Sequence, residues 1–294
     1  MAYNIDDIIF IVNPHSGKRM PEKIVSKIRK VNKDFNIFIS ESIENFYKFM
    51  NENVDKYKYF VAVGGDGAVN QTASFLFEKE DKILAVVPIG SGNGFARETG
   101  FGRNINKLIS SIEQGEFIKA DCMEIDGKKF INVAGIGFDA FVAHAFANRN
   151  KRGFVNYGIA TLQSIFKFNA MNVKIQLKDN TIQGRYNMIS MANTRQFGNN
   201  AYIAPQAHIE SRKLDLVLVK PFPFYYYPVF ILNVFAGKVK QSKYIDYISV
   251  GEDFVLETDN SMSHIDGEPI FIHNKTEVKI HKGAIKILKM KVGD

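Results

Sequence analysis

"VAVGGDGAVNQ", residues 61–71, ends an apolar run on two glycines, an aspartate and a third glycine. The apolar residues predict a buried strand, and the residues after the turn predict a helix. Glycine adopts positive φ easily and lets a ligand approach the backbone closely. Backbone N–H groups in such a turn, followed by a helix N-terminus, form an anion site. The stretch favours a nucleotide triphosphate, with Asp66 directed at a Mg²⁺ on the phosphates or at an attacking hydroxyl. The alternative is a tight turn with an aspartate cap.

Strands and helices alternate on both sides of this turn. Strands are predicted at 8–12, 36–40, 59–63 and 83–89, and helices at 21–31, 43–52, 69–79 and 94–99. The alternation predicts an α/β domain with a parallel sheet and crossover helices. Ligands of such sheets bind at the carboxyl ends of the strands. Three of these ends carry unusual residues: NPHSG (13–17), GGDGAVN (64–70) and GSGNGFAR (90–97). Neither a Walker P-loop nor a G-x-G-x-x-G fingerprint after the first strand is present.

The pattern changes after about Asp121. Short strands rich in β-branched and aromatic residues follow one another, separated by turns that include Asp-Gly pairs at 126–127 and 266–267. Helical stretches are predicted near 139–168 and 223–236. This part of the chain therefore predicts a mostly antiparallel sandwich or barrel.

Length and composition narrow the function classes. The chain has 294 residues, which is typical of two domains. Its single cysteine excludes an internal disulfide and fits a reducing compartment. The N-terminus lacks the pattern of a signal peptide, so a cytoplasmic protein is expected. The basic residues behind the net charge of +7 are mostly scattered. We therefore expect no nucleic-acid partner but a peripheral contact with anionic membrane.

The most apolar run, 222–236, is shorter than the roughly 20 residues that span a bilayer. It is interpreted as a core helix. The alternative is an apolar wall that admits acyl chains or touches the membrane.

Taken in order, NPHSG, GGDGAVN and GSGNGFAR resemble the catalytic domain of the diacylglycerol kinase family, which includes sphingosine and ceramide kinases. The resemblance continues through KADCMEI, FINVAGIGFDAFV, NTRQFGNNAYIAPQA, LDLVLV and HIDGEP, and covers essentially the whole chain. It implies an α/β nucleotide domain over 1–122 and a lipid-binding β-sandwich domain over 123–283. The last strand, 284–294, is expected to return to the first domain, and the active site to lie in the cleft between the domains.

The implied activity is transfer of the γ-phosphoryl group of ATP, with Mg²⁺, to the hydroxyl of a diacylglycerol-like or sphingoid lipid. The resemblance assigns Glu268 as general base, Asp66 as a catalytic and metal-binding residue, and Asp121 as a weaker metal ligand, through water. The implied nucleotide site comprises Asn13, Pro14, Ser16, Gly17, Ser40, Gly65, Asp66, Gly67, Ala68, Asn70 and Ser91. A hairpin-turn role is the alternative for Glu268.

Three departures from the family pattern bear on activity. Ala68 stands where the family usually has threonine, and Gly94 where many bacterial members have aspartate. Ser211-Arg212 replaces an Asp-Gly pair whose aspartate holds a structural Mg²⁺ in close relatives. Because serine and arginine are poor ligands for a hard cation, that metal site is expected to be absent.

Two other functions remain open from the sequence. NAD kinases share the GGDG turn, but the Asn-Glu pair expected downstream of it is missing. The second alternative function is non-catalytic: a protein that binds a nucleotide or a lipid and has lost activity through the changes at Ala68 and Gly94. The sequence does not identify the lipid substrate. It also leaves the oligomeric state open, and a homodimer is one of the alternatives.

Overall fold

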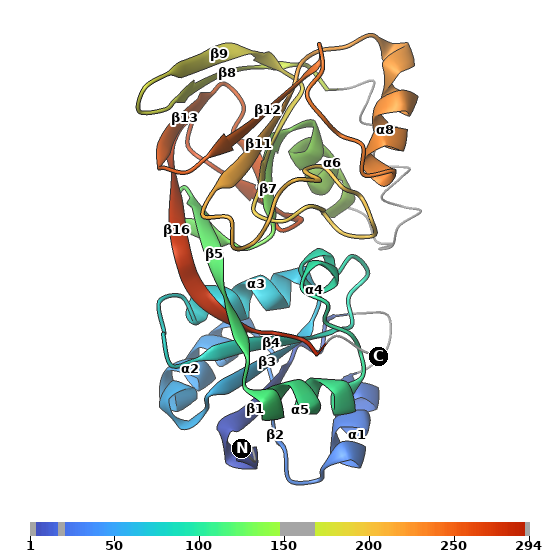
Figure 1. The fold of residues 1–294 in the computed structure, drawn as a ribbon, viewed down its shortest axis with the longest axis vertical. Coiled ribbons are helices and arrows are strands. Elements are labelled where there is room, and N and C mark those ends of the chain that lie inside the picture. Colours follow the sequence, from blue (N-terminus) through green and yellow to red (C-terminus); the bar gives the residue numbers. More distant parts are fainter. Residues whose placement is uncertain (1–3, 17–20, 148–167, 292–294) are drawn as a thin grey trace. The chain divides into compact units, whose positions relative to one another are not determined.

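The computed structural model describes residues 4–16, 21–147 and 168–291, and the chain divides into two units (Figure 1). The first comprises residues 1–120 and 283–294, and the second comprises residues 121–282. The boundaries predicted from sequence lay after residue 122 and before residue 284. Two strands, β5 (Phe117–Ile125) and β16 (Lys275–Leu288), carry the chain from one unit to the other.

The first unit is built on a parallel sheet. Its strands lie in the order β2-β1-β3-β4, and Ile287 of β16 pairs in parallel with Leu84 of β4. The strands are β1 (Ile8–Val12), β2 (Asn36–Ile39), β3 (Tyr59–Gly64) and β4 (Ile83–Pro88). The helices are α1 (Pro21–Val31), α2 (Ile43–Asn53), α3 (Asp66–Phe75), α4 (Gly94–Glu98) and α5 (Ile105–Gln114), with 3₁₀ turns η1 (Ile5–Asp7) and η2 (Val54–Lys56).

Every residue of β1, β3 and β4 is buried. Continuous apolar strands of this kind occur where helices cover both faces of a parallel sheet. Helix α5 was not predicted. It begins after Asn104, whose side chain accepts a hydrogen bond from Lys107 N–H at 3.2 Å, and ends at Gly115 with φ of 71°. These are ordinary start and stop signals for a helix.

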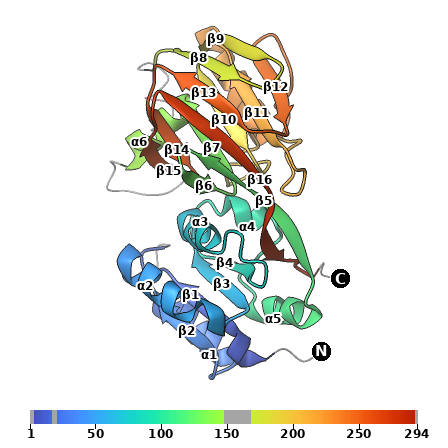
Figure 2. The same cartoon turned by 90° about the vertical axis from the view of Figure 1, so that its left-hand side faces the viewer.

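The second unit is a sandwich of two layers (Figure 2). One layer is an antiparallel sheet in the order β12-β11-β10-β7-β14-β15, and the other has the order β16-β13-β8-β9, with β5 beside β16 and β6 beside β5. The bounds are β6 (Lys128–Phe130), β7 (Val133–Gly137), β8 (Met171–Gln176), β9 (Thr181–Tyr186), β10 (Met188–Ala192), β11 (Leu214–Val219), β12 (Ile245–Val250), β13 (Phe254–Thr258), β14 (Met262–Ile265) and β15 (Glu268–Phe271).

The core of this sandwich lies between the two layers. It includes Ile189 and Leu216 from one layer and Ile175 and Leu256 from the other, all fully buried. Side chains alternate between the two faces of each strand, so every second residue enters this core. The predicted combination of an α/β domain with an antiparallel sandwich is confirmed.

The outer face of the six-stranded sheet is covered by helices. Helix α6 (Phe138–Ala147) contacts β7 and β14. The 3₁₀ turn η3 (Phe224–Tyr226) leads into helix α8 (Tyr227–Phe235), whose Phe230 and Val234 pack with Val217 of the sheet. Of the helical stretch predicted near 139–168, residues 148–167 lie outside the described residues.

Both predicted Asp-Gly turns form tight hairpins. Asp126 and Gly127 have φ of 53° and 76° between β5 and β6, and Asp266 and Gly267 have φ of 50° and 86° between β14 and β15. Two consecutive residues with positive φ match the right-handed twist of the flanking strands. In the part of the chain that the structure describes, no helix is long and apolar enough to cross a bilayer.

Candidate active site

Hydrogen bonds join three loops of the first unit at the carboxyl ends of β1, β3 and β4. Gly65 N–H donates to the Ser16 hydroxyl at 3.3 Å and ties the loop after β3 to the loop after β1. Gly90 N–H donates to the Gly64 carbonyl at 3.3 Å and ties the loop after β4 to the loop after β3. The three stretches that the sequence singled out are therefore brought together, as the position of ligands in parallel sheets predicts.

Asn13 and Ser40 lie at the same edge of the sheet. Asn13 N–H donates to the carbonyl of Val63 at 3.0 Å, and Ser40 N–H donates to the carbonyl of Val12 at 2.9 Å. Asn13 thus follows β1 beside the end of β3, and Ser40 follows β2 beside the end of β1. Both are half-buried, so their side chains retain exposure to a ligand at this edge.

Glycine is required at positions 64 and 90 because neighbouring atoms leave no room for a side chain there. A Cβ on Gly64 would lie 2.4 Å from the Cβ of Ala68, and a Cβ on Gly90 would lie 2.6 Å from the Cα of Gly65. None of Gly64, Gly65 and Gly90 has a positive φ. The expectation that these glycines supply positive φ is therefore wrong. At position 90 glycine lets the backbone approach that of Gly65, and at position 64 it leaves room for the side chain of Ala68.

Asp66 links the loop after β3 to the beginning of α4. Its Oδ1 accepts a hydrogen bond from Phe95 N–H at 3.3 Å. Burial raises the pKa of Asp66 to about 6, although hydrogen bonds from the N–H groups of Phe95, Asn93 and Gly94 act in the opposite direction. A cation beside the carboxylate would favour its charged form and lower this pKa. The half-buried carboxylate thus makes a positioning contact, and its burial disfavours the charged form in the absence of a cation.

The N-terminus of α3 is open to an anion. Gly65 is its N-cap and supplies no side-chain hydrogen bond, whereas Ser42 caps α2 and Asn104 caps α5. The first N–H groups of a helix have no partner within the helix, and its dipole favours negative charge there. The N–H groups at Gly67 and Ala68, in the first turn of α3, therefore suit a phosphate.

The remaining predicted nucleotide residues lie in α3 and in the two loops that are joined to the loop before it. Ala68 and Asn70 are half-buried in α3, Pro14 is half-buried in the loop after β1, and Ser91 is exposed in the loop after β4. Gly17 lies outside the described residues.

Glu268 is the first residue of β15, after the Asp266-Gly267 turn, and belongs to the second unit. The Asp266 carboxylate anchors the turn by accepting hydrogen bonds from Asn132 and Val133 N–H, both at 3.0 Å. Glu268 itself is exposed, and within the described residues its carboxylate has no hydrogen bond or ion pair. An anchored turn therefore presents the carboxylate of Glu268 to solvent.

Asp121 is fully buried in the second unit and is bound by Arg212. The guanidinium of Arg212 lies 2.5 Å from Oδ1, and the backbone N–H of Arg212 donates to Oδ2 at 2.6 Å. Arg212 has φ of 63°, in the left-handed region. A positive charge on Arg212 thus balances the buried carboxylate of Asp121.

Magnesium fits Asp66 better than Asp121. Mg²⁺ is usually held by one or two carboxylates together with substrate phosphates and water. Asp66 lies beside the open start of α3 and is half-buried, so it can meet an ion that arrives on a phosphate. Asp121 would have to share its oxygens with Arg212. In the described ranges, 4–16, 21–147 and 168–291, no group of three or more His, Cys, Asp or Glu side chains is arranged to hold a metal.

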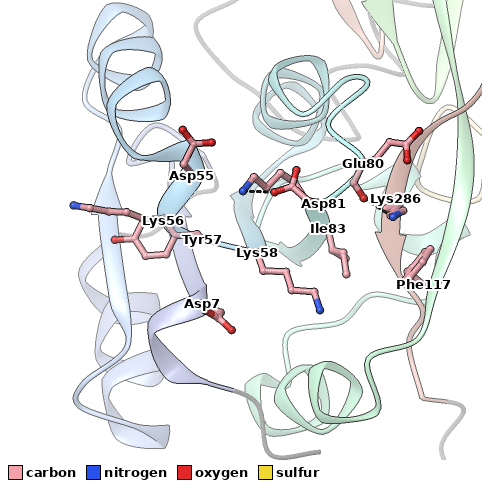
Figure 3. A pocket seen from close by; sticks show the side chains of 11 residues that line it. Asp7, Asp55, Lys56, Tyr57, Lys58, Glu80, Asp81, Ile83, Phe117 and Lys286 are labelled. Carbon is pink, nitrogen blue, oxygen red and sulfur yellow. Dashed lines mark hydrogen bonds and ion pairs between the residues drawn. The ribbon is translucent and has the colours of Figure 1, made fainter.

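A pocket of about 440 Å³ lies at the opposite edge of the first unit's sheet (Figure 3). Lys58 precedes β3 and Lys82 precedes β4, so the pocket is at the amino ends of the strands. Its charged lining residues are Asp7, Asp55, Glu80 and Asp81 with Lys56, Lys58, Lys82 and Lys286. Lys82 pairs with Asp81 at 2.6 Å. Because the charges balance, the pocket shows no preference for an anion.

A buried polar row in the second unit was not singled out by the sequence. Ser190, Gly135 and His264 pair directly across β10, β7 and β14. The carboxylate of Asp139 accepts from the Ser190 hydroxyl at 3.0 Å and lies 3.2 Å from Nε2 of His264. A Cβ on Gly135 would come within 2.1 Å of this carboxylate. Asp139 lies in FINVAGIGFDAFV, but only the fold brings its three partners together.

Two family descriptions match the chain. Residues 7–125 match "Diacylglycerol kinase catalytic domain", and residues 132–289 match "YegS C-terminal NAD kinase beta sandwich-like domain". The second match covers more than half of the chain.

Curated relatives include two proteins named diacylglycerol kinase. One, from Staphylococcus epidermidis, is 24% identical over 218 residues, which cover 71% of this chain and 69% of the relative. Another, from Staphylococcus aureus strain JH9, is 25% identical over 222 residues, with the same coverage of 71% and 69%.

Solved structures share the fold. A candidate diacylglycerol kinase from Bacillus anthracis strain Sterne superposes with a TM-score of 0.78 at 20% identity, over 97% of both chains. A second structure from the same organism, described as a diacylglycerol kinase, gives a TM-score of 0.71 at 17% identity, again over 97% of both chains.

Proposed function

The chain belongs to the diacylglycerol kinase family, and from this membership we propose that it is an ATP-dependent lipid kinase. The reaction is transfer of the γ-phosphoryl group of ATP to the hydroxyl of a diacylglycerol-like or sphingoid lipid. The observation that carries the proposal is the joining of three loops around the uncapped start of α3. This arrangement offers backbone donors to a phosphate chain.

In this proposal the first unit binds the nucleotide. The open N–H groups at Gly67 and Ala68 receive phosphate oxygens, and Asn13, Ser16 and Ser40 at the same edge of the sheet add polar groups to the site. Asp66 would hold the Mg²⁺ that comes with ATP. A bound Mg²⁺ would neutralise charge on the phosphates, which is the main requirement of phosphoryl transfer besides positioning.

Glu268 is proposed as the base. An aliphatic hydroxyl has a pKa far above neutral, so its proton must leave as the phosphoryl group arrives. The exposed carboxylate of Glu268 on its anchored turn supports this role. Asp121 is proposed as a weaker metal ligand that acts through a water molecule, because Arg212 already contacts its carboxylate.

Location and partners follow from the lipid substrate. We propose that the protein works in the cytoplasm and makes peripheral contact with an anionic membrane. The net charge of +7 and the single cysteine support this. Homodimerisation stays open.

A kinase assay on a total lipid extract tests the function. Purified protein is incubated with γ-labelled ATP, Mg²⁺ and the extract, and labelled lipids are identified by mass spectrometry. We expect one lipid class to gain a phosphate, and separate reactions with diacylglycerol and sphingosine identify the class. The Asp66→Asn variant is the control and should lose activity by orders of magnitude with nucleotide affinity within a few-fold.

Other outcomes of this assay point to other functions. Binding of ATP with no labelled product would mean that Ala68 and Gly94 have cost the chain its activity. A parallel reaction with NAD in place of lipid would expose an NAD kinase.

A further inference from the structure

A stretch of seventeen residues in the second unit, 221–237, contains no charged side chain. It includes η3 and α8, and only part of it is buried in the protein. We propose that the outer face of η3 and α8 is the surface with which the protein docks on an anionic bilayer. The inference rests on the proposed function because it specifies where a lipid kinase meets its membrane.

Helix α8 is apolar on two opposite faces. Phe230 and Val234, one turn apart, pack on the outer face of the six-stranded sheet. Val229 and Leu232 lie on the other side of the helix and are exposed. A helix that is apolar all round is normally buried in a protein core or in a membrane. The core accounts for only one of these two faces.

The outer face is large and aromatic. Its exposed fractions are Phe224 60%, Tyr225 76%, Val229 45%, Leu232 68% and Phe235 43%. These residues account for five of the eleven large apolar side chains that are exposed in the described parts of the chain. Tyrosine favours the interface between lipid tails and water, because its ring is apolar and its hydroxyl tolerates water. Phenylalanine and leucine supply the apolar side chains with which such a helix enters the acyl boundary.

A basic cluster follows the helix directly. Lys238, Lys240 and Lys243 are exposed, and in the described residues none of them forms an ion pair with a carboxylate. Lys243 lies over the ring of Tyr244 at 4.7 Å. An apolar helix face bordered by unneutralised lysines is the pattern of helices that lie in the surface of anionic membranes.

The charges favour a bilayer over a second copy of the chain. A twofold interface through this face would be isologous and place the same patch of both copies together. The three uncompensated lysines of each copy would then approach one another. An anionic lipid surface instead supplies the negative charge that the cluster lacks.

Vesicle sedimentation without nucleotide tests the inference. Vesicles of phosphatidylcholine alone are compared with vesicles that also contain phosphatidylserine, at low and high salt. We expect wild-type protein to bind the anionic vesicles more tightly and to be released by salt. The triple variant Lys238→Gln/Lys240→Gln/Lys243→Gln should weaken binding to anionic vesicles on the order of 100-fold. Each lysine near the surface contributes about tenfold or less to the affinity, and the three effects multiply.

The apolar part of the surface is tested with Leu232→Asn/Phe235→Asn. Both side chains are exposed by more than 40%, so thermal stability should fall only slightly while binding to anionic vesicles falls at least tenfold. Ile43→Asn is the matched control, because Ile43 is 58% exposed on α2 in the first unit. It should bind as wild type does.

Three results would overturn the inference. Unchanged vesicle binding by Leu232→Asn/Phe235→Asn would exclude the helix face. Equal binding to neutral vesicles, insensitive to salt, would exclude the role of the lysines. A dimer in sedimentation velocity that dissociates with the helix variant would make the face an interface between copies. A failure of the proposed function gives a different result. In that case the protein still binds vesicles but phosphorylates no lipid.

Discussion

The guanidinium of Arg212 and the carboxylate of Asp121 lie 2.5 Å apart, although 91 residues separate them in the sequence. Asp121 is fully buried, whereas the Arg212 side chain is partly exposed. The backbone N–H of Arg212 also donates to this carboxylate, which holds the residue at φ of 63°. The pair therefore fixes a turn and neutralises a buried charge together.

Removing the arginine should destabilise the second unit. Arg212→Ala leaves Asp121 buried and without its balancing charge, so the free energy of unfolding should fall by about 3 kcal/mol. Urea denaturation measures this. Arg185→Ala, an exposed arginine on β9, is the control and should change little. Asp121→Asn/Arg212→Ala should recover part of the loss. A double variant no more stable than Arg212→Ala would show that the charge is not the cause.

Asp66 should make stability depend on pH. Burial raises the pKa of Asp66 to about 6 from an ordinary 3.8. The folded state then binds the proton more tightly than the unfolded chain, so this group lowers the free energy of unfolding as pH rises from 4 to 6. The loss should be at most about 3 kcal/mol. Relative to wild type, Asp66→Asn should therefore become more stable as pH rises. Denaturation of both proteins between pH 4 and 7, without nucleotide, measures the difference. A pH-independent difference would contradict the raised pKa.

Glu268→Gln should separate catalysis from folding. The amide keeps the shape of the side chain but cannot take a proton, so turnover should fall by about 10²–10⁴-fold with ATP affinity unchanged. Asp179→Asn, which alters another exposed carboxylate of the second unit, serves as the matched control and should retain full activity. Unfolding of Glu268→Gln would support the hairpin-turn role. Unchanged turnover would place the base elsewhere, with Asp66 as the next candidate.

The lack of space for a side chain at Gly64 can be tested by substitution with alanine, which adds one methyl group. Gly64→Ala would place its Cβ 2.4 Å from the Cβ of Ala68, and should cost about 1–3 kcal/mol of stability. At Gly102 nothing lies within 4 Å of an added Cβ, so Gly102→Ala should be neutral or slightly stabilising. Thermal unfolding measures both. Gly64→Ala/Ala68→Gly removes the clash with the Ala68 side chain and should recover part of the lost stability, since glycine in α3 has its own cost. If the single variant Gly64→Ala melts as wild type does, the loops are less crowded than the structure indicates.

Local patterns predicted the elements well. Strand β1 and helix α1 have the predicted bounds, because an apolar run and a 3.6-residue periodicity are properties of neighbouring residues. Helix α5 was missed although Asn104 and Gly115 mark its ends. These two residues are local signals, so α5 is a helix that the sequence alone could predict.

Contacts across the fold could not be predicted in the same way. The reason for glycine at position 64 is the side chain of Ala68, and at position 90 it is the backbone of Gly65. The sequence suggested the loss of a metal site at Ser211-Arg212, yet it did not reveal that Arg212 would bind Asp121. Such partners are set by how loops meet in space, which spacing along the chain does not encode. The roles of Glu268 and Asp66 in turnover stay predictions.

The long strand β16 has a consequence for synthesis of the protein on the ribosome. Its last residues complete the first unit, where Ile287 pairs with Leu84, but they are made only after the whole of the second unit. Domains generally fold in the order in which they emerge. Here the second unit, residues 121–282, emerges as a continuous segment and can fold while the sheet of the first unit still lacks its last strand. The nascent chain therefore exposes one side of β4 during this interval, and an incomplete sheet edge is a site for mispairing.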